Sequence, residues 1–277
     1  MEIKKTVIIL STGRTGTMFF ANLFKELVPQ ADVYHEAGER SRLINILTHA
    51  HLSGFLPIEA PLWAWKRAIA PDLINCTKEI YIDSNNHLYA LLPQKPDLYP
   101  NLHIVHLIRD PREYVRSHIN WARHRFKSFV ANFFTPFWQP NAWLLKEMSW
   151  KKWTFLSQFQ RFSWIWYYKN QHISQLSHSG ISYLRIYFED FFDNPDPQNH
   201  LERLLNFLDF KTPVGIEDHF RRPMNPAKGK SFPKWQRWST IQCQQLNSYC
   251  GESMKKYGYG NEEDWINKLQ TSSKGVF

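Results

Sequence analysis

The chain has 277 residues, of which 43% are hydrophobic, enough for a globular domain with a substantial core. Its formal net charge of +9 and sequence pI near 9.4 favour an anionic partner: a nucleic acid, a membrane surface or a phosphorylated cofactor. The basic residues are scattered and no signature of the common DNA- or RNA-binding modules occurs, so we expect local anion sites and no nucleic-acid partner.

The first predicted elements are a strand, a loop with two glycines and a helix. Residues 6–10 are a continuous apolar run typical of a buried strand, and apolar residues recur at helical spacing over 18–28. The loop between them reads STGRTGT at 11–17. Its backbone amides and the helix N-terminus can hold a phosphate-like anion. No lysine follows Gly16, as the usual NTPase motif requires, so we do not expect ordinary ATP binding.

Strands and helices then alternate, which predicts a mostly parallel sheet whose ligands bind at the carboxyl ends of the strands. Further strands are expected at 32–35, 80–83, 103–108 and 182–187, and helices around 43–47, 86–92, 111 onward and 201–208. Residues 211–238 predict an extended surface segment, and Ser239 and Gly258 mark the ends of a last helix.

The stretch 121–179 is rich in aromatic residues and holds seven of the twelve tryptophans. We interpret it as a helical insertion or cap on one domain that spans residues 1–277. The expected fold class is therefore α/β, a P-loop-type, mostly parallel sheet flanked by helices, with an aromatic-rich helical insertion. Three interpretations of the aromatic residues remain open: an acceptor pocket, ordinary helix core, or a membrane-surface face at 123–145.

A second anion site is indicated where strand 103–108 ends. Arg109 follows the strand directly, and Ser117 lies two turns into the next helix, which has Asp110 as its N-cap and Pro111 as its first residue. A guanidinium and a hydroxyl can hold one anion together. Alternatively, Arg109 pairs with Asp110 or caps a loop, and Ser117 is a packing residue.

The two sites, in this order and spacing, resemble those of the sulfotransferases that use 3′-phosphoadenosine-5′-phosphosulfate (PAPS). In that family a loop with a basic residue followed by Ser/Thr-Gly-Thr holds the 5′-phosphosulfate. A strand ending in Arg-Asp-Pro, with a serine eight residues after the arginine, holds the 3′-phosphate. The segments 186–195 and 228–259 are also similar to the family, in which a basic-Gly pair often closes over the 3′-phosphate. The donor-binding residues that the resemblance implies are Thr12, Gly13, Arg14, Thr15, Gly16, Thr17, Arg109, Ser117, Lys228, Gly229 and Lys230.

Two positions depart from the family pattern. Met18 stands where many members have a second threonine, and it can offer only its backbone amide. Arg14 replaces the lysine of many cytosolic members, but arginine keeps the charge and presents a fork of donors, so phosphosulfate binding should survive.

The resemblance implies an enzyme, a PAPS-dependent sulfotransferase that moves a sulfuryl group to an acceptor hydroxyl or amine by in-line displacement and releases adenosine 3′,5′-bisphosphate. Arg14 would stabilise the leaving phosphate, and a general base would take the acceptor proton. Glu36 is the first candidate base, since several branches place a glutamate about twenty residues after the basic loop residue. His87 and His35 are the alternatives, and strand alternation predicts that only one of His35 and Glu36 faces the site.

No metal is expected, because cations and amides can hold the leaving phosphate and no metal-ligand cluster has a convincing spacing. The acceptor is open, with an apolar or aromatic alcohol as one candidate. Two other functions also stay open. A P-loop kinase of a nucleoside or small molecule would use Asp83 to hold magnesium. A non-catalytic relative would bind the nucleotide without transfer.

The cysteines and the start of the chain predict a cytoplasmic protein. Only Cys76, Cys243 and Cys250 are present, and no signal peptide precedes the first strand. Cys243 and Cys250 would lie about 10 Å apart along one helix, too far for a disulfide. Prolines and polar residues break the most hydrophobic segment, 129–145, so we expect no transmembrane segment, although peripheral membrane contact stays open.

Overall fold

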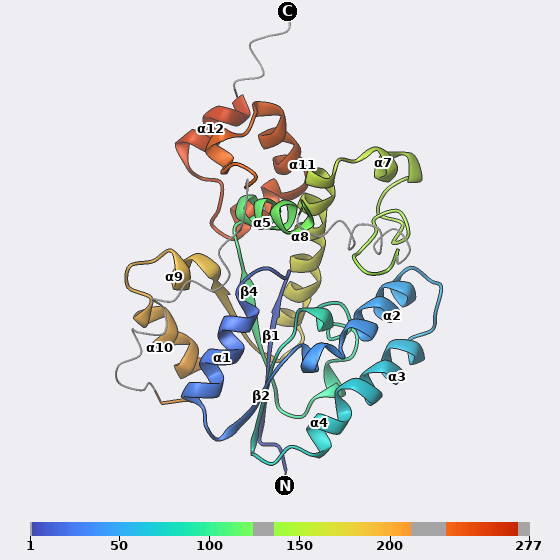
Figure 1. Cartoon of the computed structure of the whole chain (residues 1–277), viewed down its shortest axis with the longest axis vertical. Helices are drawn as coiled ribbons and strands as arrows, with labels where there is room; N and C mark the ends of the chain where they lie inside the picture. Colours follow the sequence, from blue (N-terminus) through green and yellow to red (C-terminus); the bar gives the residue numbers. More distant parts are fainter. Residues whose placement is uncertain (1, 124–135, 212–230, 271–277) are drawn as a thin grey trace, which may run out of the picture.

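The computed structural model describes residues 2–123, 136–211 and 231–270, which are arranged around one five-stranded sheet (Figure 1). All neighbouring strands pair in parallel, in the order β2-β3-β1-β4-β5. The predicted α/β class with a parallel sheet flanked by helices is confirmed. The strands are β1 (Lys5–Ser11), β2 (Ala31–His35), β3 (Ile80–Ser84), β4 (Leu102–Ile108) and β5 (Ser182–Tyr187).

Helices cover both faces of the sheet and its carboxyl edge (Figure 1). One face carries α1 (Thr17–Leu27), α9 (Phe188–Phe192) and α10 (Gln198–Phe207). The opposite face carries α2 (Arg42–Leu52), α3 (Glu59–Ala68) and α4 (Ala70–Ile74). At the carboxyl edge lie α5 (Pro111–Arg123), α7 (Trp150–Phe155), α11 (Thr240–Lys256) and α12 (Glu263–Gln270). The long helix α8 (Gln158–Gln175) runs from this edge along the face that carries α2 and α3.

The packing of β1 explains why its residues 7–10 are all apolar. Val7 and Ile9 pack into the core that includes α1 and α10, whereas Ile8 and Leu10 pack into the core on the other face. All four side chains are fully buried. A parallel strand covered on both faces has no polar side, so its sequence cannot alternate.

Part of the aromatic stretch also belongs to the core. Trp164, Ile165 and Tyr168 of α8 join the core that contains Ile8 and Leu10, and α8 lies along the chain between β4 and β5. Residues 124–135, which include most of the segment with the proposed membrane-surface face, lie outside the described residues.

Several predicted elements differ from the structure. Residues 86–92 were expected to start a helix, but only a 3-10 helix forms, Asn86–Leu88, after which the chain turns. The side chain of Asn85 accepts a hydrogen bond from the His87 amide at 3.0 Å, and Pro93 ends the stretch. Such a local side-chain bond competes with helix propagation. The helices α3, α4 and α12 were not predicted at all.

At the C-terminal side, Ser239 caps α11 with a capping box, and Gly258 follows the helix with a φ of 85°, as predicted. The expected extended segment 211–238 lies mostly outside the described residues. Its last part forms a 3-10 helix, Trp235–Arg237, and Trp235 and Trp238 are buried in a core with α5, α8, α11 and α12. Within the described ranges, no helix combines the length and the apolarity needed to cross a bilayer.

Candidate functional site

The loops that follow β1 and β4 meet at the carboxyl edge of the sheet. β1 lies between β3 and β4, with Ser11 opposite Leu107 of β4. The Nη1 atom of Arg109 donates a hydrogen bond to the backbone oxygen of Arg14 at 2.8 Å, although the two residues are 95 positions apart in the chain. The structure therefore brings the two arginines predicted from separate motifs into direct contact.

The loop after β1 has the backbone of an anion-binding nest. Gly13, Arg14 and Gly16 have φ angles of 88°, 57° and 82°, all in the left-handed region. Successive turns of this kind direct backbone amides toward one point. A Cβ atom at Gly16 would lie 3.0 Å from the Phe192 ring, so this position requires glycine for space as well as for its backbone angle.

Two hydroxyl groups of this loop are orphaned. Within the described residues, the Oγ1 atoms of Thr12 and Thr15 are buried and have no hydrogen-bond partner. Buried polar atoms in native structures are nearly always paired, so each orphan needs an explanation such as a ligand or an ordered water. These hydroxyls fit a loop that completes its hydrogen bonding when an anion binds.

Arg109 is held on both sides. Its guanidinium lies 4.1 Å from the centre of the Phe188 ring, and its backbone oxygen accepts a hydrogen bond from Trp166 Nε1 at 2.9 Å. Its Nε atom is buried without a partner in the described parts of the chain, and burial lowers the pKa of the guanidinium from its ordinary value. A planar cation with an unused donor at a strand end suits a phosphate oxygen.

Arg109 does not pair with Asp110. Asp110 instead pairs with Arg112, with 2.6 Å between Oδ2 and Nη2, and accepts the Arg112 amide at 2.8 Å as the predicted helix cap. Arg112 also binds Glu262, so its own charge is neutralised within the fold. The sequence analysis did not single out Arg112, whose partner Glu262 lies 150 residues away.

Ser117 lies half-buried on α5, and the segment after residue 230 attaches beside it. The Arg116 Nε donates to the Phe232 backbone oxygen at 3.0 Å, and the Asn120 Oδ1 accepts from the Phe232 amide. Phe232 is therefore tied to the turn of α5 that carries Ser117. Lys228, Gly229 and Lys230, the predicted basic segment, lie outside the described residues.

His35 and Glu36 both lie near the loop after β1, His35 directly at the start of α1 and Glu36 through Asn86. His35 Nε2 lies 3.2 Å from Thr17 Oγ1, at the start of α1. Glu36 Oε1 accepts a hydrogen bond from Asn86 Nδ2 at 2.6 Å, and the Asn86 amide lies 3.7 Å from the Cβ position of Gly13. The structure thus brings His35 to the start of α1, and it brings Glu36 close to Gly13 through Asn86.

The backbone explains how two adjacent side chains both come near this loop. Strand alternation ends at His35, because Glu36 and Ala37 have φ angles of 52° and 47° and begin a 3-10 helix, Glu36–Glu39. Two successive non-glycine residues in the left-handed region are strained, and such strain clusters at functional sites. The Ser41 hydroxyl holds the turn by donating to the Glu36 backbone oxygen at 2.9 Å.

His87 is buried in a polar network. Its Nδ1 lies 3.0 Å from the Ser41 hydroxyl. Burial, followed by the charges of Lys169 and Arg42, lowers the pKa of the imidazole to about 3. The ring is therefore neutral at pH 7 and a weak proton acceptor.

Asp83 lies under the same turn and is fully buried. Its Oδ2 accepts from Asn85 Nδ2 at 2.9 Å, and its Oδ1 faces the Ala37 amide at 3.5 Å. Burial raises the pKa of this carboxyl to about 7. In the described portion of the chain, no group of three or more His, Cys, Asp or Glu side chains is arranged to hold a metal ion.

One stripe of α8 touches both loops, and the sequence analysis missed it. Trp166 binds the Arg109 backbone, Lys169 Nζ lies 3.4 Å from the Thr12 backbone oxygen, and Asn170 Oδ1 lies 2.9 Å from His106 Nε2. The spacing of three and four residues places these side chains on one helix face. The available signal was Lys169-Asn170, a polar pair that directly follows the aromatic run at 164–168.

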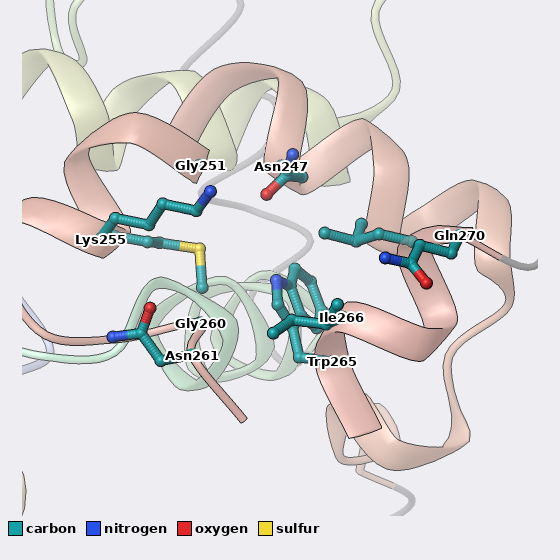
Figure 2. A pocket seen from close by; sticks show the side chains of 10 residues that line it. Asn247, Gly251, Lys255, Gly260, Asn261, Trp265, Ile266 and Gln270 are labelled. Carbon is teal, nitrogen blue, oxygen red and sulfur yellow. The ribbon is translucent and has the colours of Figure 1, made fainter. Parts of the chain in front are cut away.

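A separate pocket of about 270 Å³ lies between α11 and α12 (Figure 2). Met254, Trp265 and Leu269 contribute its apolar lining, and Lys255 and Asn261 add polar groups. Neither the loop at 12–17 nor Arg109 nor Ser117 lines this pocket, so it is distinct from the two motif loops.

No protein-family model matches the sequence, and no curated protein matches it. Among the solved structures that are similar to it are two sulfotransferase domains. One is the sulfotransferase domain from the curacin biosynthetic pathway, at 15% identity, with 99% of each chain covered and a TM-score of 0.47. The other is the sulfotransferase domain from the Synechococcus PCC 7002 olefin synthase, at 14% identity, with 100% of this chain and 98% of that chain covered and a TM-score of 0.44. At these values the likeness does not define an activity, which has to be inferred from the chain's own residues.

Proposed function

We propose that this chain is a sulfotransferase that takes a sulfuryl group from PAPS and transfers it to an acceptor hydroxyl or amine. The observation that carries the proposal is the hydrogen bond of 2.8 Å that joins Arg109 to Arg14. PAPS carries its 5′-phosphosulfate and its 3′-phosphate on one ribose, so it needs two anion sites side by side. The two motif loops, joined at the carboxyl ends of β1 and β4, meet that need.

The residues present fit such a donor. The orphaned hydroxyls of Thr12 and Thr15 and the left-handed glycines of the loop suit the phosphosulfate. Arg109, with its buried unpaired Nε, suits the 3′-phosphate, and the resemblance assigns Ser117 and the segment 228–230 to the same group. Arg14 is exposed on the loop, so its side chain is accessible to a ligand that binds there from solution.

The donor supplies an activated sulfuryl group, and the protein supplies positioning, charge and a proton acceptor. A bond forms between the acceptor oxygen and sulfur, while the bond between sulfur and the bridging oxygen breaks and leaves its electron pair on the phosphate. Arg14 and the loop amides stabilise this charge. The acceptor proton passes to Glu36.

Glu36 is the preferred base for a geometric reason. Its carboxylate is half-buried, and Asn86 orients it beside Gly13 through a hydrogen bond of 2.6 Å. His87 is less suited, since its pKa of about 3 makes it a poor acceptor at neutral pH and its Nδ1 already contacts Ser41. A positioned base typically contributes about 10²- to 10⁴-fold to the rate.

Aromatic groups lie near the candidate base, which supports an apolar or aromatic alcohol as acceptor. The rings of His87 and Trp138 lie 6.2 Å apart, and Asn45 fixes the Trp138 backbone through a hydrogen bond of 2.9 Å. Apolar and aromatic walls with a few placed polar groups are typical of small-molecule pockets.

Thermal unfolding with nucleotides tests the proposal. Adenosine 3′,5′-bisphosphate should raise the melting temperature more than AMP, which lacks the 3′-phosphate, and more than Mg-ATP. The Arg14→Ala variant should lose most of this shift, whereas Arg67→Ala, which removes a cation stacked on Trp63 of α3, should keep it. Stabilisation by Mg-ATP alone would favour a kinase and overturn the proposal.

A transfer assay separates an enzyme from a binding protein. PAPS is incubated with a panel of aromatic and aliphatic alcohols, and release of the bisphosphate is measured. Nucleotide binding without transfer to any acceptor, and without any effect of Glu36→Gln, would point to a non-catalytic relative.

A further inference from the structure

Lys169 is a buried cation that the proposed reaction does not yet use. The residue is 4% exposed, on the side of α8 that faces the sheet. Its Nζ lies 3.4 Å from the Thr12 backbone oxygen and 5.1 Å from the centre of the Tyr89 ring. An ammonium has three donors, and within the described residues these find one acceptor, at the long end of the hydrogen-bond range. A buried charge that is so incompletely paired is costly, which indicates that an anion completes its surroundings.

Lys169 interacts electrostatically with His118 on α5, with His87 and with the candidate base Glu36. Burial lowers the pKa of His118 on α5, the helix of Ser117, and Lys169 lowers it further. Burial and Lys169 likewise lower the pKa of His87, next to the candidate base. Burial lowers the pKa of Lys169 itself to about 8, while the Glu36 carboxylate opposes that shift. Lys169 is thus near α5, the helix that carries Ser117, and also near Glu36.

We propose that Lys169 supplies the ammonium that the loop after β1 lacks, and that its Nζ binds the sulfuryl oxygens of the donor at the base of this loop. The inference rests on the proposed function, because it concerns the group that PAPS delivers. In the usual phosphate-binding loop the lysine directly follows the second glycine, where this chain has Thr17. Here a lysine from α8, 157 residues after Thr12, lies against the same loop.

This role has a defined chemical consequence. The ammonium donates hydrogen bonds to oxygens of the group in transfer, so it binds the sulfated donor more than the desulfated product. It forms and breaks no covalent bond. A purely structural lysine would instead only tie α8 to the Thr12 backbone, and its removal would weaken binding of both nucleotides equally.

The Lys169→Met variant distinguishes these roles. Affinities for PAPS and for adenosine 3′,5′-bisphosphate are measured by calorimetry without an acceptor. We expect the affinity for PAPS to fall about 10- to 100-fold, as for loss of a charge-assisted hydrogen bond, and the affinity for the bisphosphate to fall less than about threefold. Equal losses for the two nucleotides would overturn the proposal.

Lys5→Met is the matched control. Lys5 lies at the opposite end of β1, where its Nζ binds the Leu208 backbone oxygen and Asp209. Its loss removes a partly buried ammonium from the same strand without touching the site. Both affinities should therefore remain unchanged in this variant.

The wild-type protein gives a second readout that needs no variant. The titratable groups that face Lys169 from neighbouring elements are Glu36, His49, His87, Tyr89 and His118. The three histidines have pKa values of about 3, and burial raises the pKa of Tyr89 well above its ordinary value, so none of these four changes charge near pH 8. The ratio of PAPS affinity to bisphosphate affinity should fall as pH rises through about 8, where Lys169 loses its proton. A constant ratio between about pH 7 and pH 9.5 would contradict the proposal, even if Lys169→Met does not fold.

Failure of the proposed function has a different signature. If the wild-type protein binds neither nucleotide, the sulfotransferase proposal fails, and inorganic sulfate at matched ionic strength becomes the probe. If sulfate stabilises the wild-type protein and Lys5→Met but not Lys169→Met, Lys169 is still an anion-binding residue. Equal stabilisation of all three proteins, or of none, would overturn that role as well.

Discussion

Asp83→Asn tests how the buried carboxyl under the Glu36 turn affects stability. Asp83 is fully buried, and burial raises its pKa from 3.8 to about 7. Its Oδ2 accepts from Asn85 at 2.9 Å, a hydrogen bond that an asparagine oxygen can also accept. Asparagine therefore keeps the shape of the protonated carboxyl and removes the charge.

The size and sign of the effect follow from the two pKa values. Between about pH 4 and pH 7 the native protein holds a proton that the unfolded chain has released, so this group's contribution to stability falls as pH rises through that window. A difference of about three pKa units corresponds to about 4 kcal/mol of lost stability above pH 7. The neutral variant keeps this stability. The free energy of unfolding of Asp83→Asn, relative to that of the wild-type protein, should therefore rise by up to about 4 kcal/mol as pH rises from about 4 to about 8.

Denaturant unfolding at about pH 4.5, 6 and 8 measures this gain, with Asp32→Asn as the control. Asp32 is a carboxylate whose folded-state pKa is lowered; burial opposes that shift, but a hydrogen bond of 2.8 Å from the Thr77 amide favours the charged form. Its substitution should therefore destabilise the protein at neutral pH, and the difference should disappear as pH falls through the lowered pKa. If Asp83→Asn is less stable than the wild-type protein at pH 8, or if its difference is independent of pH, the assignment of a charged, buried Asp83 is refuted.

Three further substitutions address the site. Gly16→Ala should destabilise the fold by about 1–3 kcal/mol, because alanine is strained at a φ of 82° and its Cβ would meet Phe192, whereas Gly54→Ala, with no atom within 4 Å, should show only the backbone cost in chemical denaturation. Arg109→Ala should weaken adenosine 3′,5′-bisphosphate binding about 10- to 100-fold and AMP binding less, since only the first has a 3′-phosphate; equal losses in calorimetry would refute that assignment. Glu36→Gln should retain bisphosphate binding but lower the transfer rate at least about 100-fold in steady-state kinetics, and an unchanged rate would exclude Glu36 as the base.

The contacts that build the site could be predicted only in part. The Arg14 loop and Arg109 are recognisable because each is a short, local pattern at the end of a strand. The link from Glu36 through Asn86 to Gly13 could not be recognised in the sequence. It depends on strained backbone angles at Glu36 and Ala37, which strand alternation does not predict. A sequence pattern reports preferences over a few residues, whereas these angles are held by packing around them.

Lys169 shows the same limit more strongly. Its helix was interpreted as part of an insertion because its tryptophans dominate the composition, yet α8 packs on the sheet and carries Lys169 to the Thr12 backbone. Burial of that ammonium, its lowered pKa and its one acceptor among the described residues all result from how the helix lies on β1 and β4.

The sequence by itself determined the parallel α/β fold, the strand positions and the local patterns of the Arg14 loop and of Arg109, because hydrophobic periodicity and glycine placement act locally. Only the tertiary structure decided that Arg109 binds the Arg14 backbone, that His35 contacts Thr17 while Glu36 binds Asn86, and that α8 brings a buried cation to the Thr12 backbone. These contacts join residues 18 to 157 positions apart, and their formation depends on how helices pack against the sheet.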